Sequence, residues 1–165
     1  RNPAAKAKLI ERLRDLYPEL TSYDEVFPGA GLLELVFHEG DFTIPATRLS
    51  DGSLRYLALL AILCDPDPPP LICIEEPEIG LHPDLLPKIT ELMVEASERT
   101  QLIVTTHSDV IIDALTDFPE SVIVCEKHNH QTEMRRIPEK KLKVWLEKYS
   151  LGELWTSGEI GGTRW

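Results

Sequence analysis

The chain has 165 residues, 42% of them hydrophobic, and a formal net charge of −11 at pH 7. This length suits one domain with a sizeable core, and no apolar run approaches the ~20 residues of a membrane-spanning helix, so we expect no membrane association. Residues 51–120 hold 3 Lys and Arg against 14 Asp and Glu. Such an acidic segment is a poor nucleic-acid surface, and it suits either a cation site or a solvated acidic face.

The N-terminus and the cysteines give a prediction of the cellular compartment. No signal-peptide pattern is present at the N-terminus, and the chain begins at Arg1 rather than Met, so we expect it to be part of a longer protein. Three cysteines lie within or at the end of apolar runs and lack the spacing of a disulfide framework: Cys64, Cys73 and Cys125. This usage predicts buried, reduced thiols and a cytoplasmic protein.

The first third of the chain is predicted to contain two helices and a hairpin. Apolar residues at helical spacing predict a helix over residues 5–17, which Pro18 ends. Residues 32–38 and 42–45 are predicted to be strands joined by a short turn. The segment 53–64 is apolar nearly all round and predicts a buried helix.

Strands and helices are predicted to alternate through the rest of the chain. Residues 71–74 and 101–105 have the fully apolar composition of central parallel strands, and a helix opened by Pro83 lies between them. A short helix is expected over 109–115. Further elements are expected towards the C-terminus: strands over 121–126 and 132–137, a helix over 139–149, and an extended Gly-rich tail over 151–165.

This alternation favours an α/β domain with a mainly parallel sheet. Chemistry in such sheets gathers beyond the carboxyl ends of the strands. Glu75 and Glu76 follow the first apolar strand, where one carboxylate suits Mg²⁺ and the other can orient and deprotonate a water molecule. A solvated acidic turn would explain the same two residues.

Two further segments are suited to binding phosphate. Residues 50–53 are small, and they open the apolar helix, whose N-terminus favours an anion; plain N-capping is the alternative. His107 follows the second strand and can donate a hydrogen bond to a phosphate oxygen. The alternative there is a helix cap made by Ser108, with His107 incidental.

The order and spacing of these segments resemble the C-terminal half of the ABC-class ATPase domain. LSDGS at 49–53 resembles the signature motif, and LICIEE at 71–76 resembles Walker B with its catalytic glutamate. PEIGLHPD at 77–84 resembles the D-loop region, and TTHS at 105–108 the switch histidine. The form EEPEIGLHP is most similar to bacterial predicted AAA-type ATPases of the RecF-like, chromosome-maintenance-like and overcoming-lysogenisation-defect-like kinds.

The resemblance implies a P-loop NTPase-type fold, a mainly parallel sheet flanked by helices, of which this chain supplies the C-terminal lobe only. It implies three parts: residues 1–31 end an N-terminal or inserted helical segment, residues 32–150 form the C-terminal part of the ATPase domain, and residues 151–165 form a tail. No GxxxxGK[ST] phosphate loop, or Walker A, occurs in the chain. We therefore expect an N-terminal half that carries this loop.

ATP and Mg²⁺ are the cofactors that the resemblance implies, and the partner is a second copy of the protein in an ATP-sandwiched dimer. Ser50 and the backbone N–H groups of Gly52 and Ser53 would contact the γ-phosphate across the interface. Asp51 and Ser53 replace the Gly and Gln of the commoner signature, so the Asp51 carboxylate must point away from the phosphate.

The resemblance also divides the roles of the remaining site residues. Glu75 would help hold Mg²⁺, although most Walker B motifs have Asp at this position. Glu76 would orient and activate water, and His107 would contact the γ-phosphate.

The function implied is ATP hydrolysis by the full-length protein in DNA repair, chromosome maintenance or phage defence, with the isolated chain inactive. Contact with DNA or a partner nuclease is suggested by kinship alone. Two alternatives stay open: a non-catalytic dimerisation or docking module, and a metal-dependent nuclease. The nuclease would use Glu75, Glu76 and Glu78.

Overall fold

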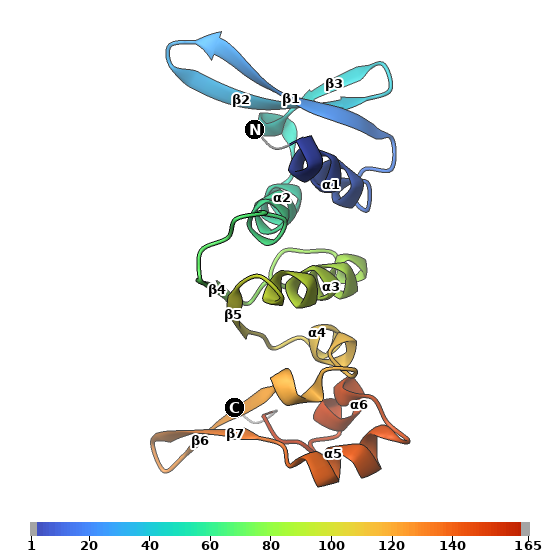
Figure 1. The fold of residues 1–165 in the computed structure, drawn as a ribbon, viewed down its shortest axis with the longest axis vertical. Helices are drawn as coiled ribbons and strands as arrows, with labels where there is room; N and C mark the ends of the chain where they lie inside the picture. The colour runs from blue at the N-terminus through green and yellow to red at the C-terminus, as the bar shows by residue number, and fades with distance from the viewer. Residues whose placement is uncertain (1–2, 163–165) are drawn as a thin grey trace. The chain divides into compact units, whose positions relative to one another are not determined.

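The computed structural model describes residues 3–162 of the chain (Figure 1). They fold as two compact units that meet in sequence between Thr105 and Thr106. Each unit is described by itself. None of the described helices is long and apolar enough to cross a membrane.

A three-stranded antiparallel sheet forms the first part of the first unit. It consists of β1 (Leu20–Gly29), β2 (Leu32–Glu39) and β3 (Phe42–Pro45), in that order. The predicted β2–β3 hairpin is confirmed, and its turn places Gly40 at φ +55°. The sequence analysis missed β1, because this strand contains residue types that strands disfavour, among them Asp24 and Pro28.

Three helices supply most of the buried residues of the first unit. They are α1 (Pro3–Leu13), α2 (Asp51–Leu63) and α3 (Leu86–Ser97), and α2 contacts both of the others. Short 3₁₀ turns precede α2 at Ala46–Arg48 and α3 at Pro83–Leu85. The following side chains are fully or nearly buried: Leu13, Tyr56, Leu60, Leu63, Ile89, Leu92 and Ala96.

Two predicted helices differ from the structure in detail. The first ends at Leu13, four residues earlier than predicted, and residues 14–16 continue as turns. The second was predicted to be buried nearly all round, yet Leu54 and Ile62 on α2 are exposed.

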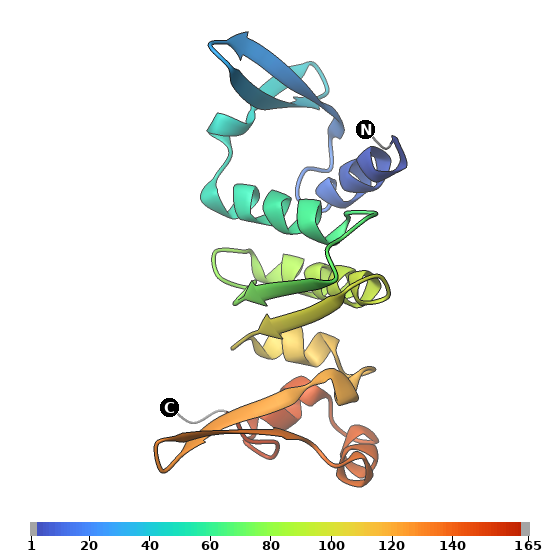
Figure 2. The same cartoon turned by 60° about the vertical axis from the view of Figure 1, so that its left-hand side comes forward.

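A pair of parallel strands follows, β4 (Leu71–Glu75) and β5 (Gln101–Thr105). Figure 2 shows the two strands side by side with α3 against one face. The hydroxyl of Thr100 donates to the carbonyl of Pro69 at 2.5 Å, and the next N–H in the chain donates to the carbonyl of Pro70 at 3.2 Å. These bonds align the two strand starts, so both strands end at the same edge.

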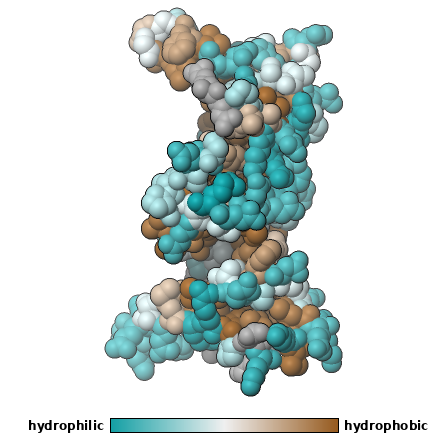
Figure 3. Space-filling model, in the orientation of Figure 1, coloured by the Kyte–Doolittle hydropathy of each residue, from teal (hydrophilic) through white to brown (hydrophobic). Residues whose placement is uncertain are grey.

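One face of the β4–β5 pair is open, which differs from the central, fully buried strands that we predicted. On this face Leu71 is 45% exposed and Ile103 51% exposed, and Cys73 is exposed as well. The prediction of buried cysteines is therefore wrong for Cys73, and also for Cys125, while Cys64 is buried. The opposite face is half-buried and carries Ile72, Ile74, Leu102 and Val104. A second apolar surface lies at the end of the β1–β2 hairpin, where Phe27 is 71% exposed (Figure 3).

The second unit combines a hairpin with three short helices. Its elements are α4 (Asp109–Ala114), a 3₁₀ turn (Pro119–Ser121), β6 (Ile123–His128), β7 (Gln131–Arg136), α5 (Glu139–Leu146) and α6 (Leu151–Thr156). The predicted strands and helices are confirmed to within a few residues. The buried core of the unit contains Ile112, Val124, Ile137, Leu142, Leu151, Leu154 and Ile160.

The C-terminal segment is not the extended tail that we predicted. It contains α6, which begins with a capping box in which Ser150 and Glu153 bond to each other's backbone N–H. Two apolar residues then point into the core, Leu151 and Leu154. The Gly-rich composition of 158–162 obscured this signal, and residues 163–165 lie outside the described part of the chain.

Ion pairs join α1 to α3 in the first unit. Lys8 on α1 contacts Glu95 on α3, and Arg12 and Arg99 lie 3.8 and 3.7 Å from the same carboxylate. The hydrogen bond from Lys8, with the neighbouring positive charges, lowers the pKa of Glu95 below its ordinary value of 4.5. The carboxylate is therefore more stable as an anion in the folded chain than in the unfolded chain.

We expect Glu95→Gln to destabilise the chain at neutral pH by about 1 kcal/mol or less, because the side chain is 36% exposed and solvent screens its ion pairs. A lowered pKa contributes stability above the ordinary value of 4.5, and this contribution is lost as the pH falls through the lowered value. Urea denaturation should be measured from neutral pH down to below the ordinary pKa of 4.5. The difference in free energy of unfolding between variant and wild type should shrink as the pH falls. Glu91→Gln, at an exposed position of the same helix, is the control, and equal losses in both variants would contradict the prediction.

Candidate functional site

The first turn of α2 is organised by Ser50. Ser50 is the N-cap residue, and its Oγ accepts a hydrogen bond from the N–H of Ser53 at 3.2 Å. The N-cap that we considered as an alternative is therefore present, and the phosphate-binding role of this segment stays a prediction. The N–H groups of Asp51 and Gly52 are at the start of the helix, where no helix carbonyl lies four residues back to accept them. They leave donors and a partial positive charge at this end of the helix.

A residue distant in sequence completes this turn. The hydroxyl of Tyr17 donates to Ser53 Oγ at 2.7 Å, and Ser53 Oγ lies 2.9 Å from Ser50 Oγ. Ser53 is only 9% exposed. The three hydroxyl groups thus form one chain that runs from the α1–β1 connection to the helix cap.

The two carboxylates lie at the carboxyl end of β4, as predicted. Glu75 is the last residue of the strand and pairs in register with Thr105. Glu76 follows it, and its N–H donates to the carbonyl of Thr105 at 2.9 Å. Its φ is +44°, in the left-handed region that residues other than glycine rarely adopt. Such strained positions cluster at functional sites.

The loop after the carboxylates packs against the first turns of α2. Arg55 donates from Nη1 to the carbonyl of Ile79 at 2.5 Å. A Cβ atom placed on Gly52 would lie 2.5 Å from the carbonyl oxygen of Gly80, so a side chain has no room there. The structure therefore brings the Ser50–Ser53 turn and the segment following Glu76 into direct contact.

His107 belongs to the second unit and is exposed. The residue after it, Ser108, is the N-cap of α4, with its Oγ accepting from the N–H of Ile111 at 3.3 Å. The cap that we considered as an alternative is thus present. The proposed role of His107 stays a prediction.

The donor chemistry at the end of β4 suits Mg²⁺, which is usually held by one or two carboxylates together with substrate phosphates. A metal site made of protein ligands alone would need three or more such side chains close together. Across residues 3–162, no group of three or more His, Cys, Asp or Glu side chains comes together to hold a metal ion. The nuclease alternative, which needs such a group at Glu75, Glu76 and Glu78, gains no support from the described residues.

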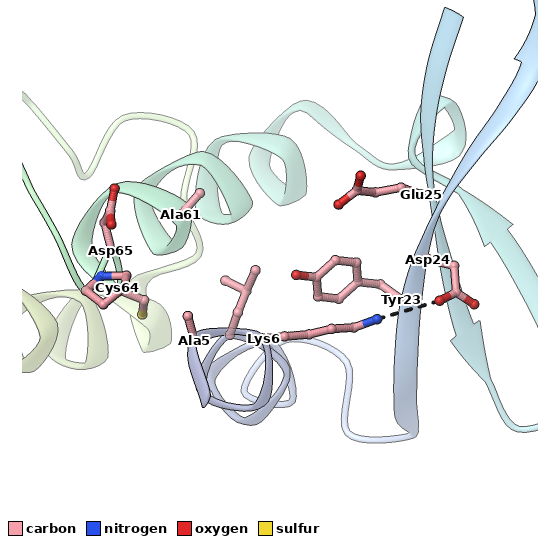
Figure 4. Close-up of a pocket in the computed structure, with 10 residues that line it drawn as sticks. Ala5, Lys6, Tyr23, Asp24, Glu25, Ala61, Cys64 and Asp65 are labelled. Carbon is pink, nitrogen blue, oxygen red and sulfur yellow. Dashed lines mark ion pairs between the residues drawn. The ribbon is translucent and has the colours of Figure 1, made fainter. Parts of the chain in front are cut away.

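A cavity of about 400 Å³ lies elsewhere in the first unit, between α1, β1 and the end of α2. In Figure 4, Lys6 extends from α1 to β1, where it pairs with Asp24 at 3.6 Å. Burial raises the pKa of the Cys64 thiol, which disfavours a reactive thiolate there. None of the predicted site residues lines this cavity, and we place no chemistry in it.

Comparison with known protein families identifies the chain. Residues 1–113 match the family model described as "AAA domain, putative AbiEii toxin, Type IV TA system". The chain belongs to this AAA domain family. Among curated proteins, none matches it in sequence.

Solved structures with a similar fold include SMC ATPases and SMC head domains. One, from work on ATP-driven dimerisation and DNA-stimulated activation of SMC ATPases, aligns over 88% of this chain and 90% of its own, with a TM-score of 0.61 and 18% identity. An SMC head bound to the C-terminal winged-helix domain of ScpA gives a TM-score of 0.67 at 18% identity over 86% of this chain. An SMC head with an extended coiled coil, derived from Pyrococcus furiosus and bound to the C-terminal domain of ScpA, gives 0.65 at 19% identity over 88%.

These likenesses confirm the predicted fold class, an α/β domain of the P-loop NTPase type, and the ABC/AAA-type ATPase domain. The chain spans 44% and 37% of the two ScpA-bound heads. Because their identities are below 20%, we take the fold alone from them.

Sequence reasoning missed two residues of this site. Tyr17 lies 36 positions from its partner Ser53, and no local pattern links them. Arg55 could have been noticed, because it is the only charged residue within the apolar segment 53–64. In the structure its guanidinium donates to the carbonyl of Ile79.

We expect Gly52→Ala to destabilise the chain by about 1–3 kcal/mol, because the new methyl group must displace the backbone at Gly80. Urea denaturation of the two proteins measures this difference. Asp51→Ala is the control: it adds no atoms and removes a favourable helix N-terminal charge worth about 0.5 kcal/mol. Equal stability of the two variants would contradict the close contact.

Proposed function

We propose that the chain is the C-terminal part of an ATP-hydrolysing domain of the ABC/AAA type. One observation carries the proposal: in a chain of the AAA domain family, the Ser50–Ser53 turn and the loop after Glu76 are in direct contact through Gly52 and Gly80. An anion-binding helix N-terminus and a pair of carboxylates are thus held by one rigid connection, which suits phosphate transfer to water.

In this proposal the γ-phosphate of ATP meets the N-terminus of α2. The Ser50 hydroxyl and the N–H of Gly52 donate to it. The N–H of Ser53 already donates to Ser50 Oγ, so Ser53 supports phosphate binding by holding the Ser50 hydroxyl in place. The partial positive charge of a 13-residue helix favours the phosphate at this end.

The two carboxylates divide the remaining chemistry. Glu75, exposed at the end of β4, helps to hold Mg²⁺. Glu76 orients the attacking water and accepts its proton, because its backbone is fixed by the bond to Thr105. His107 contacts the γ-phosphate, and ATP with Mg²⁺ are the cofactors.

The partners that we propose are an N-terminal half with the phosphate loop and a second copy of the protein. The first is supported by the open apolar face at Leu71, Cys73 and Ile103, since a two-stranded sheet is marginal without a further layer. The second is supported by the ATP-driven dimerisation of the related SMC ATPases. We propose a cytoplasmic setting in DNA maintenance or phage defence, where DNA or a partner nuclease would be bound.

The first test is Mg²⁺-dependent ATP turnover by the full-length protein, wild type against Glu76→Gln. We expect the variant to bind ATP while turnover falls by about 10²–10⁴-fold, because the amide cannot accept the proton of water. The ATP-bound dimer should therefore persist in the variant, as gel filtration can show.

Glu98→Gln, at an exposed position near the end of α3, is the control and should keep wild-type turnover. Vigorous turnover by Glu76→Gln would remove the assigned base. If wild type is inactive even with DNA and partners supplied, the domain is a docking module.

A second test concerns the chain alone. Without a phosphate loop it should bind ATP at least about 100-fold more weakly than the full-length protein, because the loop supplies most phosphate donors. Isothermal titration calorimetry on both proteins makes the comparison. Equal affinities would contradict the need for an N-terminal half.

A further inference from the structure

Three hydroxyl groups in the first unit form a chain of hydrogen bonds. Tyr17 donates to Ser53 Oγ at 2.7 Å. Each serine hydroxyl has one proton to donate and two lone pairs that accept. Ser50 Oγ lies 2.9 Å from Ser53 Oγ, and either hydroxyl could donate there. Accepting the proton of Tyr17 polarises the O–H of Ser53, which favours Ser53 as the donor to Ser50.

The end of this chain is Ser50. Its Oγ accepts the N–H of Ser53 at 3.2 Å and, with the direction above, the O–H of Ser53 as well. Both of its lone pairs are then used. The Ser50 hydroxyl becomes a pure donor whose proton points away from Ser53. A phosphate oxygen, which only accepts hydrogen bonds, is the group that such a donor matches.

We propose that Tyr17 is a positioning residue for the phosphate site: its hydroxyl sets the direction of the Ser53–Ser50 chain, so that Ser50 presents its proton to the terminal phosphate of a nucleoside triphosphate. This inference rests on the proposed function. Without the Tyr17 proton, Ser53 is no longer favoured as the donor, so Ser50 can turn and donate to Ser53, and the phosphate loses a donor. Hydrogen bonds in a chain also polarise one another, which strengthens the last donor.

The position of Tyr17 explains why this effect can be separated from folding. Tyr17 is half-buried in the turn after α1, so Tyr17→Phe keeps the ring and removes only the hydroxyl. The chain supplies a matched control nearby. Tyr56 is fully buried on α2, and its hydroxyl donates to the carbonyl of Arg12 at 3.2 Å, away from the two serines.

The experiment measures KM and kcat for ATP, and the affinity for ADP, in the full-length protein. We expect Tyr17→Phe to raise KM for ATP by about 3- to 10-fold, the effect of weakening one hydrogen bond to the charged phosphate without removing the Ser50 hydroxyl. The value of kcat and the affinity for ADP should change by less than about 2-fold, because the lost donor is common to ground and transition states and ADP lacks the terminal phosphate. Tyr56→Phe should leave all three values unchanged while lowering the melting temperature.

A double-mutant cycle tests the route of the effect. If Tyr17 acts through Ser53, then Tyr17→Phe combined with Ser53→Ala should be no worse than Ser53→Ala alone. Additive effects, or an unchanged KM in Tyr17→Phe, would overturn the positioning role while leaving ATP hydrolysis intact. A wild-type protein that neither binds nor hydrolyses ATP would overturn the proposed function and, with it, this inference.

Discussion

The contact between the first turn of α2 and the loop after β4 fixes the geometry of the first unit. It depends on the absence of a side chain at Gly52, which lets the carbonyl of Gly80 come close to the helix. Arg55 adds a hydrogen bond to the neighbouring carbonyl of Ile79. Because Glu76 begins this loop, the contact links the backbone that carries its carboxylate to α2.

The parallel pairing of β4 with β5 fixes the backbone positions of the two glutamates. Register places Glu75 beside Thr105, and Glu76 continues the ladder by donating to the same residue. A carboxylate at the end of a hydrogen-bonded strand moves less than one in a free loop. The same two strands also have an open apolar face. A two-stranded pair of this kind is marginally stable until a further layer of protein covers that face.

The sequence predicted the parts of this fold that depend on local patterns. Apolar runs gave β4 and β5 to within one residue, and the small residues at 50–53 marked the start of α2. The misses arise from longer-range causes. β1 is a strand because it pairs with β2, although Asp24 and Pro28 disfavour strands. Local spacing also cannot show that Tyr17 reaches Ser53, or that one face of β4 is uncovered.

The left-handed backbone of Glu76 has a consequence for how this protein tolerates change. A non-glycine residue at φ +44° stores strain of order 1–3 kcal/mol, and glycine would adopt the same conformation without that cost. Selection for thermal stability alone would therefore drive this position towards glycine and erase the carboxylate. Under the proposed function the glutamate costs stability that glycine would keep, so efforts to make the domain more robust should leave this residue unchanged.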